Sequence, residues 1–264
     1  MSFTYDPRLS YSHRVKVLAD AVAKPALKDL YLRAMASVDW HRIEAIRTKH
    51  AAQLVDFDPG SKLKYLDVPY WTWLRLTEVR NIGLDLSSPK RILDLGCGCA
   101  HFALLLRALG HSYVGTDIDE PFYIEMCEAL EINRISHCID RNKALPDFGG
   151  PFDLVTAFDI CFNYVGTVPG KEGFNGNRIV YFSAQDWTNF LNDLCGQMKY
   201  SGRIFFIPNQ RLRLDGSYGH EPELLTHFQN IGAKPQIKFR SITYDIAVSD
   251  FLIATAPARG GLSA

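Results

Sequence analysis

The chain has 264 residues, of which 47% are hydrophobic, and it carries 29 basic and 29 acidic side chains. This composition excludes a largely disordered chain, and the length predicts one α/β domain with a helical extension. No apolar run reaches the roughly 18 residues of a membrane helix. The sequence also lacks the dense basic face of a nucleic-acid binder.

The N-terminus lacks the apolar core of a signal peptide, which predicts a cytoplasmic protein. The six cysteines form no CxxC pair and have no histidine-rich cluster near them in sequence. No metal site is therefore expected, and the cysteines are interpreted as reduced thiols.

Residues 1–85 are expected to form a helical N-terminal extension. One amphipathic helix begins at Pro25 and reaches Val38, and its apolar pattern can be continued to Leu54. The Asp58-Pro59-Gly60 sequence breaks the chain, and a second helix is predicted over 64–84. The aromatic side chains of this second segment either face a ligand or pack in the core. They are Tyr65, Tyr70, Trp71 and Trp73.

Residues 86–264 are expected to form the main domain, which begins with a βαβ unit over 91–119. An apolar strand leads into a glycine-rich turn at Gly96 and Gly98, and an amphipathic helix follows until Gly110. A second strand then ends at Asp117. This order places a nucleotide-type ribose or phosphate site at the carboxyl edge of the strands.

The spacing of the glycines argues against a dinucleotide. A dinucleotide fingerprint requires glycine at the first, third and sixth turn positions, and the sixth position counted from Gly96 is His101. The turn also has an acidic residue, Asp94, two positions before its first glycine.

The rest of the chain continues as alternating strands and helices. Helices are predicted over 120–134, 183–199 and 221–231, and strands over 135–139, 152–158 and 203–208. The last two apolar runs, 236–242 and 244–255, are predicted to form a hairpin.

The D-x-G-x-G pattern of Asp94, Gly96 and Gly98, followed by an acid after the second strand, resembles the class I methyltransferases that use S-adenosylmethionine (SAM). The later element order also resembles that family. The resemblance implies a doubly wound, seven-stranded sheet, mostly parallel with an antiparallel last strand, with helices on both faces. It also implies that the N-terminal helices act as a lid over the cofactor cleft.

The resemblance assigns roles to individual residues. Asp117 would bind both ribose hydroxyls, and Asp140 would lie near the adenine amino group. Asp159, after the fourth strand, and Tyr164 are the candidates for contacting or deprotonating the substrate. The complete implied cofactor set is Asp94, Gly96, Cys97, Gly98, Asp117, Ile118, Asp140 and Phe158.

The expected function is methyl transfer from SAM to a small polar molecule, with S-adenosylhomocysteine as the second product. The acceptor atom stays open among oxygen, nitrogen and carbon, and a general base is needed only if the acceptor must lose a proton. Two alternatives are a non-catalytic SAM-binding protein on the same fold and an NAD-dependent oxidoreductase. The intact Asp94, Gly96, Gly98 and Asp117 argue against the non-catalytic protein. His101 at the sixth turn position and the Asp94 pattern argue against the oxidoreductase.

Overall fold

The computed structural model describes residues 4–140, 143–160, 162–166, 178–208, 211–212, 218–219, 222–238 and 241–256. These residues belong to two compact units. One consists of Met1–Arg91 and Gly96–His137, and the other consists of Ile92–Leu95 and Cys138–Ala264.

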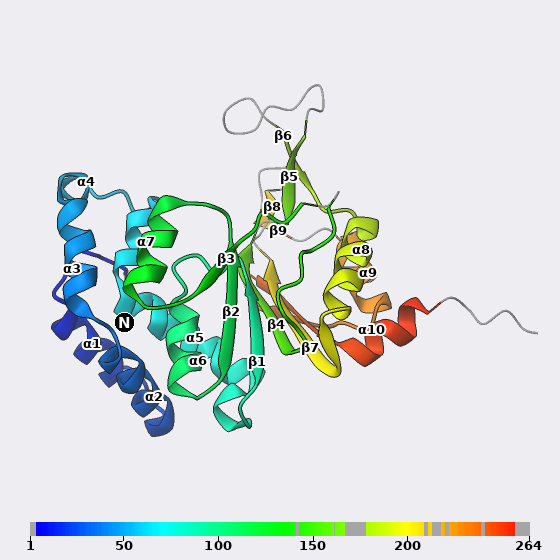
Figure 1. Cartoon of the computed structure of the whole chain (residues 1–264), viewed down its shortest axis with the longest axis horizontal. Coiled ribbons are helices and arrows are strands. Elements are labelled where there is room, and N and C mark those ends of the chain that lie inside the picture. The colour runs from blue at the N-terminus through cyan, green and yellow to red at the C-terminus, as the bar shows by residue number, and fades with distance from the viewer. Residues whose placement is uncertain are drawn as a thin grey trace, which may run out of the picture. The chain divides into compact units, whose positions relative to one another are not determined.

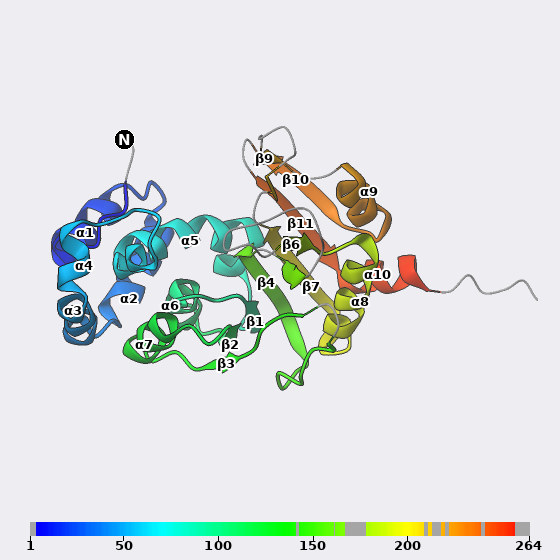
Figure 2. The same ribbon diagram turned by 90° about the horizontal axis from the view of Figure 1, so that it is seen from above.

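The first unit begins with helices that surround a shared apolar core. Figures 1 and 2 show α1, α2 and α3 grouped together, and α5 and α6 pack against this group. The helices are α1 (Tyr11–Asp20), α2 (Pro25–Ala36), α3 (Trp40–Lys49), α4 (Ala51–Val55), η1 (Lys62–Leu66), α5 (Val68–Ile82), η2 (Leu84–Leu86), α6 (His101–Ala108) and α7 (Pro121–Ala129). Strands β2 (Ser112–Asp117) and β3 (Arg134–Ser136) complete this unit.

The second unit contains the remaining strands and three helices of the described chain. The strands are β1 (Arg91–Leu95), β4 (Phe152–Ile160), β5 (Asn163–Gly166), β6 (Arg178–Tyr181), β7 (Met198–Pro208), β8 (Arg211–Leu212), β9 (Tyr218–Gly219), β10 (Lys234–Lys238) and β11 (Ser241–Ala247). Figure 2 shows α8 (Ala184–Cys195), α9 (Pro222–Asn230) and α10 (Val248–Thr255) gathered beside β7, β10 and β11.

The main sheet has seven strands, hydrogen-bonded in the order β10-β11-β7-β4-β1-β2-β3. The pairs β1–β4, β4–β7 and β2–β3 are parallel, whereas β11 runs antiparallel to both of its neighbours. The predicted α/β class, and a mostly parallel sheet whose last strand is antiparallel, are therefore confirmed.

Several local predictions of secondary structure were wrong or incomplete. The helices predicted over 120–134 and 183–199 end at Ala129 and Cys195, and the strand predicted over 135–139 covers Arg134–Ser136. The apolar pattern over 25–54 is divided, because the Asp39 side chain accepts the backbone N–H groups of His41 and Arg42 and starts a new helix there. Helix α1 was not predicted. The predicted terminal hairpin ends at Ala247, and α10 follows with Asp250 in its first turn, where the helix dipole favours an acid.

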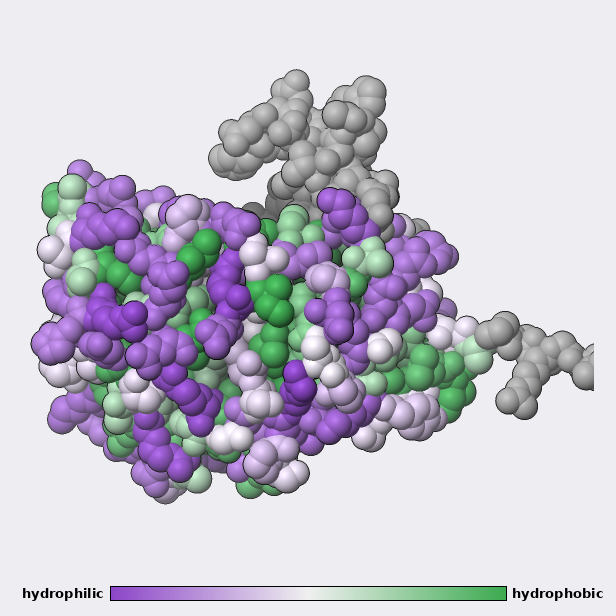
Figure 3. All heavy atoms as spheres, viewed as in Figure 1, coloured by the Kyte–Doolittle hydropathy of each residue, from purple (hydrophilic) through white to green (hydrophobic). Residues whose placement is uncertain are grey.

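Few large hydrophobic side chains are exposed among the residues that the structure describes. Leu252 and Ile253 of α10 are 39% and 70% exposed, and Figure 3 shows hydrophobic surface at that helix. Among the described residues, no helix combines the length and the hydropathy that a membrane span requires.

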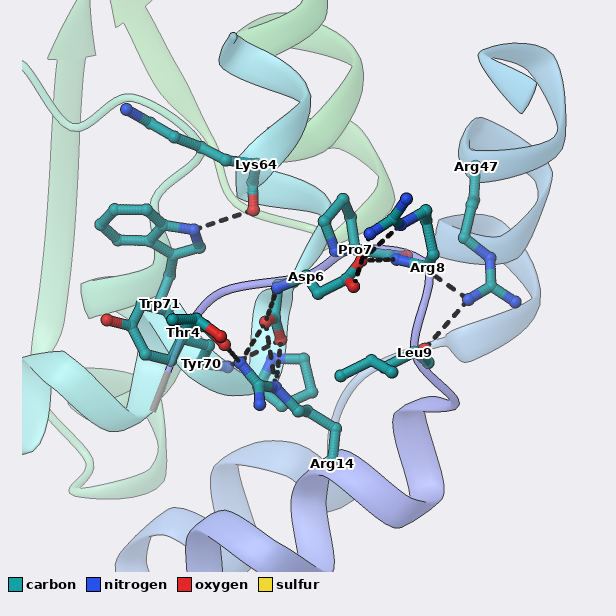
Figure 4. Close-up of polar contacts among 12 residues, drawn as sticks. Thr4, Asp6, Pro7, Arg8, Leu9, Arg14, Arg47, Lys64, Tyr70 and Trp71 are labelled. Carbon is teal, nitrogen blue, oxygen red and sulfur yellow. Dashed lines mark hydrogen bonds and ion pairs between the residues drawn. The ribbon is translucent and has the colours of Figure 1, made fainter. Parts of the chain in front are cut away.

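The N-terminal segment is fastened to α5 by a buried ion pair. Arg14 of α1 donates from Nη2 to Oδ2 of Asp67 at 2.7 Å, and the two side chains are only 9% and 1% exposed. The Asp67 carboxylate also accepts the backbone N–H of Asp6 at 3.0 Å and that of Tyr70 at 3.2 Å, as Figure 4 shows. Burial raises the pKa of Asp67, and the bonds from Arg14 oppose this effect.

Removing the cation from this pair leaves a buried and uncompensated carboxylate. We expect Arg14→Met to lower the free energy of unfolding by about 3–5 kcal/mol, as is usual when one partner of a buried pair is removed. Urea denaturation measures the change. The control is Lys16→Met on the same helix, because Lys16 pairs with Asp20 on the exposed surface and should contribute at most about 1 kcal/mol. Equal losses in the two variants would contradict the prediction.

Candidate functional site

The turn between β1 and α6 needs left-handed backbone at alternate positions. The φ angles are 63° at Gly96, 54° at Gly98 and 55° at Ala100. Glycine adopts this conformation without strain, whereas Ala100 adopts it while fully buried against Ala103 and Cys127. A Cβ added at Gly98 would meet no protein atom within 4 Å. The turn therefore exposes its backbone to an open side.

The carboxylate of Asp117 at the end of β2 is bound to this turn. Its Oδ2 accepts the Gly98 N–H at 2.6 Å, and its Oδ1 accepts the N–H of Ile118 at 2.7 Å. The structure therefore brings together the glycine turn and the acid, two features separated by 19 positions in the sequence. An ionised carboxylate has about four lone-pair sites, so two acceptor positions are left for a ligand.

The backbone around Asp117 is held by a residue that the sequence analysis missed. Arg134 of β3 donates from Nη2 to the carbonyl oxygens of Asp117, at 3.1 Å, and of Ile118. The N–H of His137 donates to the same Asp117 carbonyl at 2.9 Å. An arginine at the start of a strand has no sequence signal for this role, because the contact depends on how β3 pairs with β2.

Two further predicted cofactor residues lie next to these groups in sequence. Ile118 is 49% exposed and offers an apolar surface beside the Asp117 carboxylate. Cys97 is half-buried, and its N–H donates to the Thr116 carbonyl of β2 at 3.1 Å. A Cβ at Gly115 would come within 2.9 Å of the Cys97 Sγ, so the glycine in β2 makes room for the turn.

His101 begins α6, directly after the turn, and joins it to the helical extension. Its ring is buried, and Nε2 donates to the carbonyl of Tyr65 in η1 at 3.0 Å. Burial lowers the pKa of His101 to about 3, so the ring is neutral at physiological pH. The residue that argued against a dinucleotide is therefore a structural link between α6 and η1.

In the second unit, Asp94 of β1 is a buried acceptor. The residue is 3% exposed, and its Oδ1 accepts the hydroxyl of Thr156 in β4 at 2.7 Å. Thr156 is fully buried and was not singled out in the sequence. The parallel register that pairs Asp94 with Thr156 explains the contact, and no local pattern could predict it.

The other predicted residues of this unit lie at or beyond strand ends. Phe158 is 7% exposed and packs its ring edge-on against Phe205. Asp159 is exposed, has a φ of 59° and lies at a register irregularity of the β4–β7 pair. Asp140 forms an ion pair with Lys143 at 3.7 Å. Tyr164 lies in β5, but its side chain is outside the described residues.

No group of three or more His, Cys, Asp or Glu side chains suited to a metal ion occurs in the part of the chain that the structure describes. The described cysteines are free thiols. Burial raises the pKa of the Cys99 thiol, which keeps it protonated.

A family model described as a methyltransferase domain matches residues 72–166, which include the glycine turn and Asp117. The chain carries a methyltransferase domain. Its sheet order and its D-x-G-x-G turn are of the class I, Rossmann-like type, whose cofactor is SAM, so the family resemblance is confirmed.

Curated relatives match a short part of the chain. Ribosomal protein L11 methyltransferase from Thermotoga neapolitana is 33% identical over 73 residues, which are 27% of this chain and 28% of the relative. This chain therefore matches less than a third of that relative's length.

Solved structures with a similar fold include two methyltransferases. Ribosomal protein L11 methylase from Lactobacillus delbrueckii subsp. bulgaricus has a TM-score of 0.42 and 17% identity, with 66% of this chain and 76% of that chain covered. A SAM-bound amino pentose methyltransferase from Micromonospora echinaspora has a TM-score of 0.44 and 12% identity, with 67% of this chain and 91% of that chain covered.

The neutral His101 makes stability depend on pH. Its pKa is lower in the folded chain, so the unfolded chain binds the proton more readily and stability is lost as the pH falls below about 6.5. From pH 7.5 to pH 5 we expect this residue to lower the free energy of unfolding by about 2 kcal/mol, measured by urea titration.

The matched variant is His101→Gln, whose amide can still donate to Tyr65 but does not titrate. It should reduce the pH dependence, and the part due to His111 and His227, whose pKa values burial also lowers, should remain. His41→Gln, at an exposed position, should leave it unchanged. If the free energy of unfolding of His101→Gln fell with pH as steeply as that of the wild type, His101 would not be the residue that causes the pH dependence.

Proposed function

We propose that this protein transfers the methyl group of SAM to a small polar acceptor and releases S-adenosylhomocysteine. The observation that carries this proposal is the bond between the Gly98 N–H and the Asp117 carboxylate at 2.6 Å. It presents an ordered pair of carboxylate acceptors beside an open glycine backbone, which suits a ribose with two adjacent hydroxyls.

The proposed cofactor contacts follow from this geometry. Asp117 would accept the ribose hydroxyls, Ile118 would contact the adenine, and Gly98 would allow close approach of the cofactor. The remaining proposed contacts are Asp94, Gly96, Cys97, Asp140 and Phe158. The bound cofactor supplies a sulfonium methyl, which is already a strong electrophile. The protein therefore needs mainly to orient the acceptor in line with it.

The division into residues 1–85 and 86–264, with the first part as a lid, stays a proposal. Two contacts within the first unit support it. The Tyr65 carbonyl of η1 accepts from His101 at the start of α6, and Lys62 of η1 pairs with Glu120, which precedes α7. The same short segment thus contacts the beginnings of the helices that follow β1 and β2.

A protein acceptor is the second candidate, because the matched curated relatives are ribosomal protein L11 methyltransferases. The third candidate function is that of a protein that binds SAM without transferring its methyl group. The cytoplasmic location also stays a prediction.

The cofactor assignment is tested by calorimetric titration with S-adenosylhomocysteine, with NAD⁺ in parallel. Charge-assisted hydrogen bonds contribute about 1.5–3 kcal/mol each, so Asp117→Ala should weaken binding by at least about tenfold. The control is Asp119→Ala, which removes an exposed carboxylate two positions away and should bind as wild type. Tight binding by a folded Asp117→Ala protein, or binding of NAD⁺ instead, would refute the assignment.

The acceptor class is tested by supplying labelled SAM to the protein with a cell extract that has been divided by ultrafiltration. We expect the label to enter the low-molecular-weight fraction, in step with the formation of S-adenosylhomocysteine. Transfer only to the protein fraction would favour the protein acceptor. Cofactor binding without label transfer to either fraction would favour the non-catalytic alternative.

Asp159 is the proposed group for orienting or deprotonating the acceptor. Asparagine tolerates left-handed backbone as aspartate does, so Asp159→Asn should keep the local fold and remove only the charge. If Asp159 acts as the base, kcat should fall by about 10²–10⁴ with unchanged affinity for S-adenosylhomocysteine. An unchanged kcat would exclude this role.

A further inference from the structure

The side chain of Lys64 in η1 lies among aromatic rings. Its Nζ is 5.1 Å from the ring centre of Tyr65, 5.7 Å from that of Trp71 and 6.0 Å from that of Tyr5. We call these three rings the aromatic box. Figure 4 shows the Lys64 side chain extending on the Trp71 side of the segment, away from Arg14.

Two of the three rings of the aromatic box are hydrogen-bonded to the backbone. The Tyr5 hydroxyl donates to the Pro59 carbonyl at 2.7 Å, and the Trp71 Nε1–H donates to the Lys64 carbonyl at 2.9 Å. The third residue, Tyr65, is held through its main-chain carbonyl, which accepts a hydrogen bond from His101. The rings also pack on one another, with 4.8 Å between the ring centres of Tyr65 and Trp71 and 5.4 Å between those of Tyr5 and Trp71. This packing and tethering reduce the entropy that the rings lose when a cation binds over them.

Lys64 makes cation–π contacts with all three rings. Among the residues that the structure describes, no carboxylate pairs with it, whereas Lys62, two positions earlier, pairs with Glu120. Aromatic faces attract cations through their quadrupole, and they select alkylated ammonium ions, as in the cages that bind choline or methyl-lysine. Lys64 is a half-buried residue, and its ammonium therefore occupies a site with the chemistry of an onium receptor.

The aromatic box also lies next to elements of the proposed cofactor site within the first unit. The Tyr65 ring is 6.0 Å from that of His101, which follows the glycine turn, and 5.9 Å from that of Tyr123 in α7. Burial raises the pKa of Tyr123, and the negative charges of Asp117 and Glu120 add to this effect.

We propose that the aromatic box is the acceptor subsite for an alkylammonium group, and that Lys64 occupies it until the substrate displaces the lysine. The inference rests on the proposed methyl transfer and narrows its acceptor to molecules that carry an alkylated ammonium ion. The primary ammonium of Lys64 is strongly hydrated, so it can return to water when a bulkier and less hydrated cation binds.

Calorimetry and tryptophan fluorescence test the subsite with choline as the probe. Lys64→Ala vacates the box while keeping the backbone carbonyl that accepts from Trp71, so choline should bind at least tenfold more tightly than to wild type. Lys64→Gln, which keeps a long side chain without charge, should also bind choline more tightly. The matched control is Lys62→Ala, which removes a charge outside the box and should bind choline as wild type.

Three comparisons decide whether the box recognises the charge through its rings. The uncharged isostere 3,3-dimethylbutan-1-ol should bind Lys64→Ala at least tenfold more weakly than choline. Adding Trp71→Leu to Lys64→Ala should abolish choline binding. The proposal is overturned if choline binds both folded Lys64 variants no better than wild type, or if the neutral isostere binds equally well.

Two further titrations separate this proposal from related ones. The sulfonium of SAM is also an onium ion, so Trp71→Leu should leave the ratio of SAM to S-adenosylhomocysteine affinity unchanged. A fall in that ratio would assign the box to the cofactor and overturn the proposal. Normal binding of S-adenosylhomocysteine without choline binding would refute the subsite alone, whereas choline binding without S-adenosylhomocysteine binding would refute the proposed function.

Discussion

The buried carboxylate of Asp67 is the group on which the helical part of this chain depends. Three segments donate to it: the N-terminal stretch through Asp6, helix α1 through Arg14, and the first turn of α5 through Tyr70. A charge removed from water is tolerated only when it is paired and hydrogen-bonded. These bonds fasten the first turn of α5, which carries Trp71, to α1 and to the N-terminal stretch.

The consequences of this contact reach the glycine turn. Asp67 directly follows η1, whose Tyr65 carbonyl accepts from His101 at the start of α6. On the other side of the turn, main-chain N–H groups hold the Asp117 carboxylate, and Arg134 holds its backbone. A site ordered in this way loses little conformational entropy when a ligand binds. The aromatic box is built on the same short segment, which couples the proposed acceptor subsite to the extension.

The features that the sequence predicted well are those encoded by neighbouring residues. Apolar periodicity and breakers gave the α/β class, and the spacing of Asp94, Gly96 and Gly98 gave the family. The errors arose where a single polar residue outweighs a long pattern, as Asp39 does when it interrupts the apolar stripe over 25–54. The assignments of Asp140, Phe158 and Asp159 stay predictions, and the side chain of Tyr164 is outside the described residues.

The sequence by itself determined the fold class and the acid that ends β2, because glycine freedom and strand-to-turn order act over a few adjacent positions. Its resemblance to the class I methyltransferases implied the cofactor. Only the tertiary structure decided that Thr156 supports Asp94, that Arg134 holds the Asp117 backbone and that His101 bonds to Tyr65. It also brought Tyr5 and Trp71 around Lys64. Several of these partners lie tens of positions apart in the chain, and they meet only because strand register and helix packing bring them together.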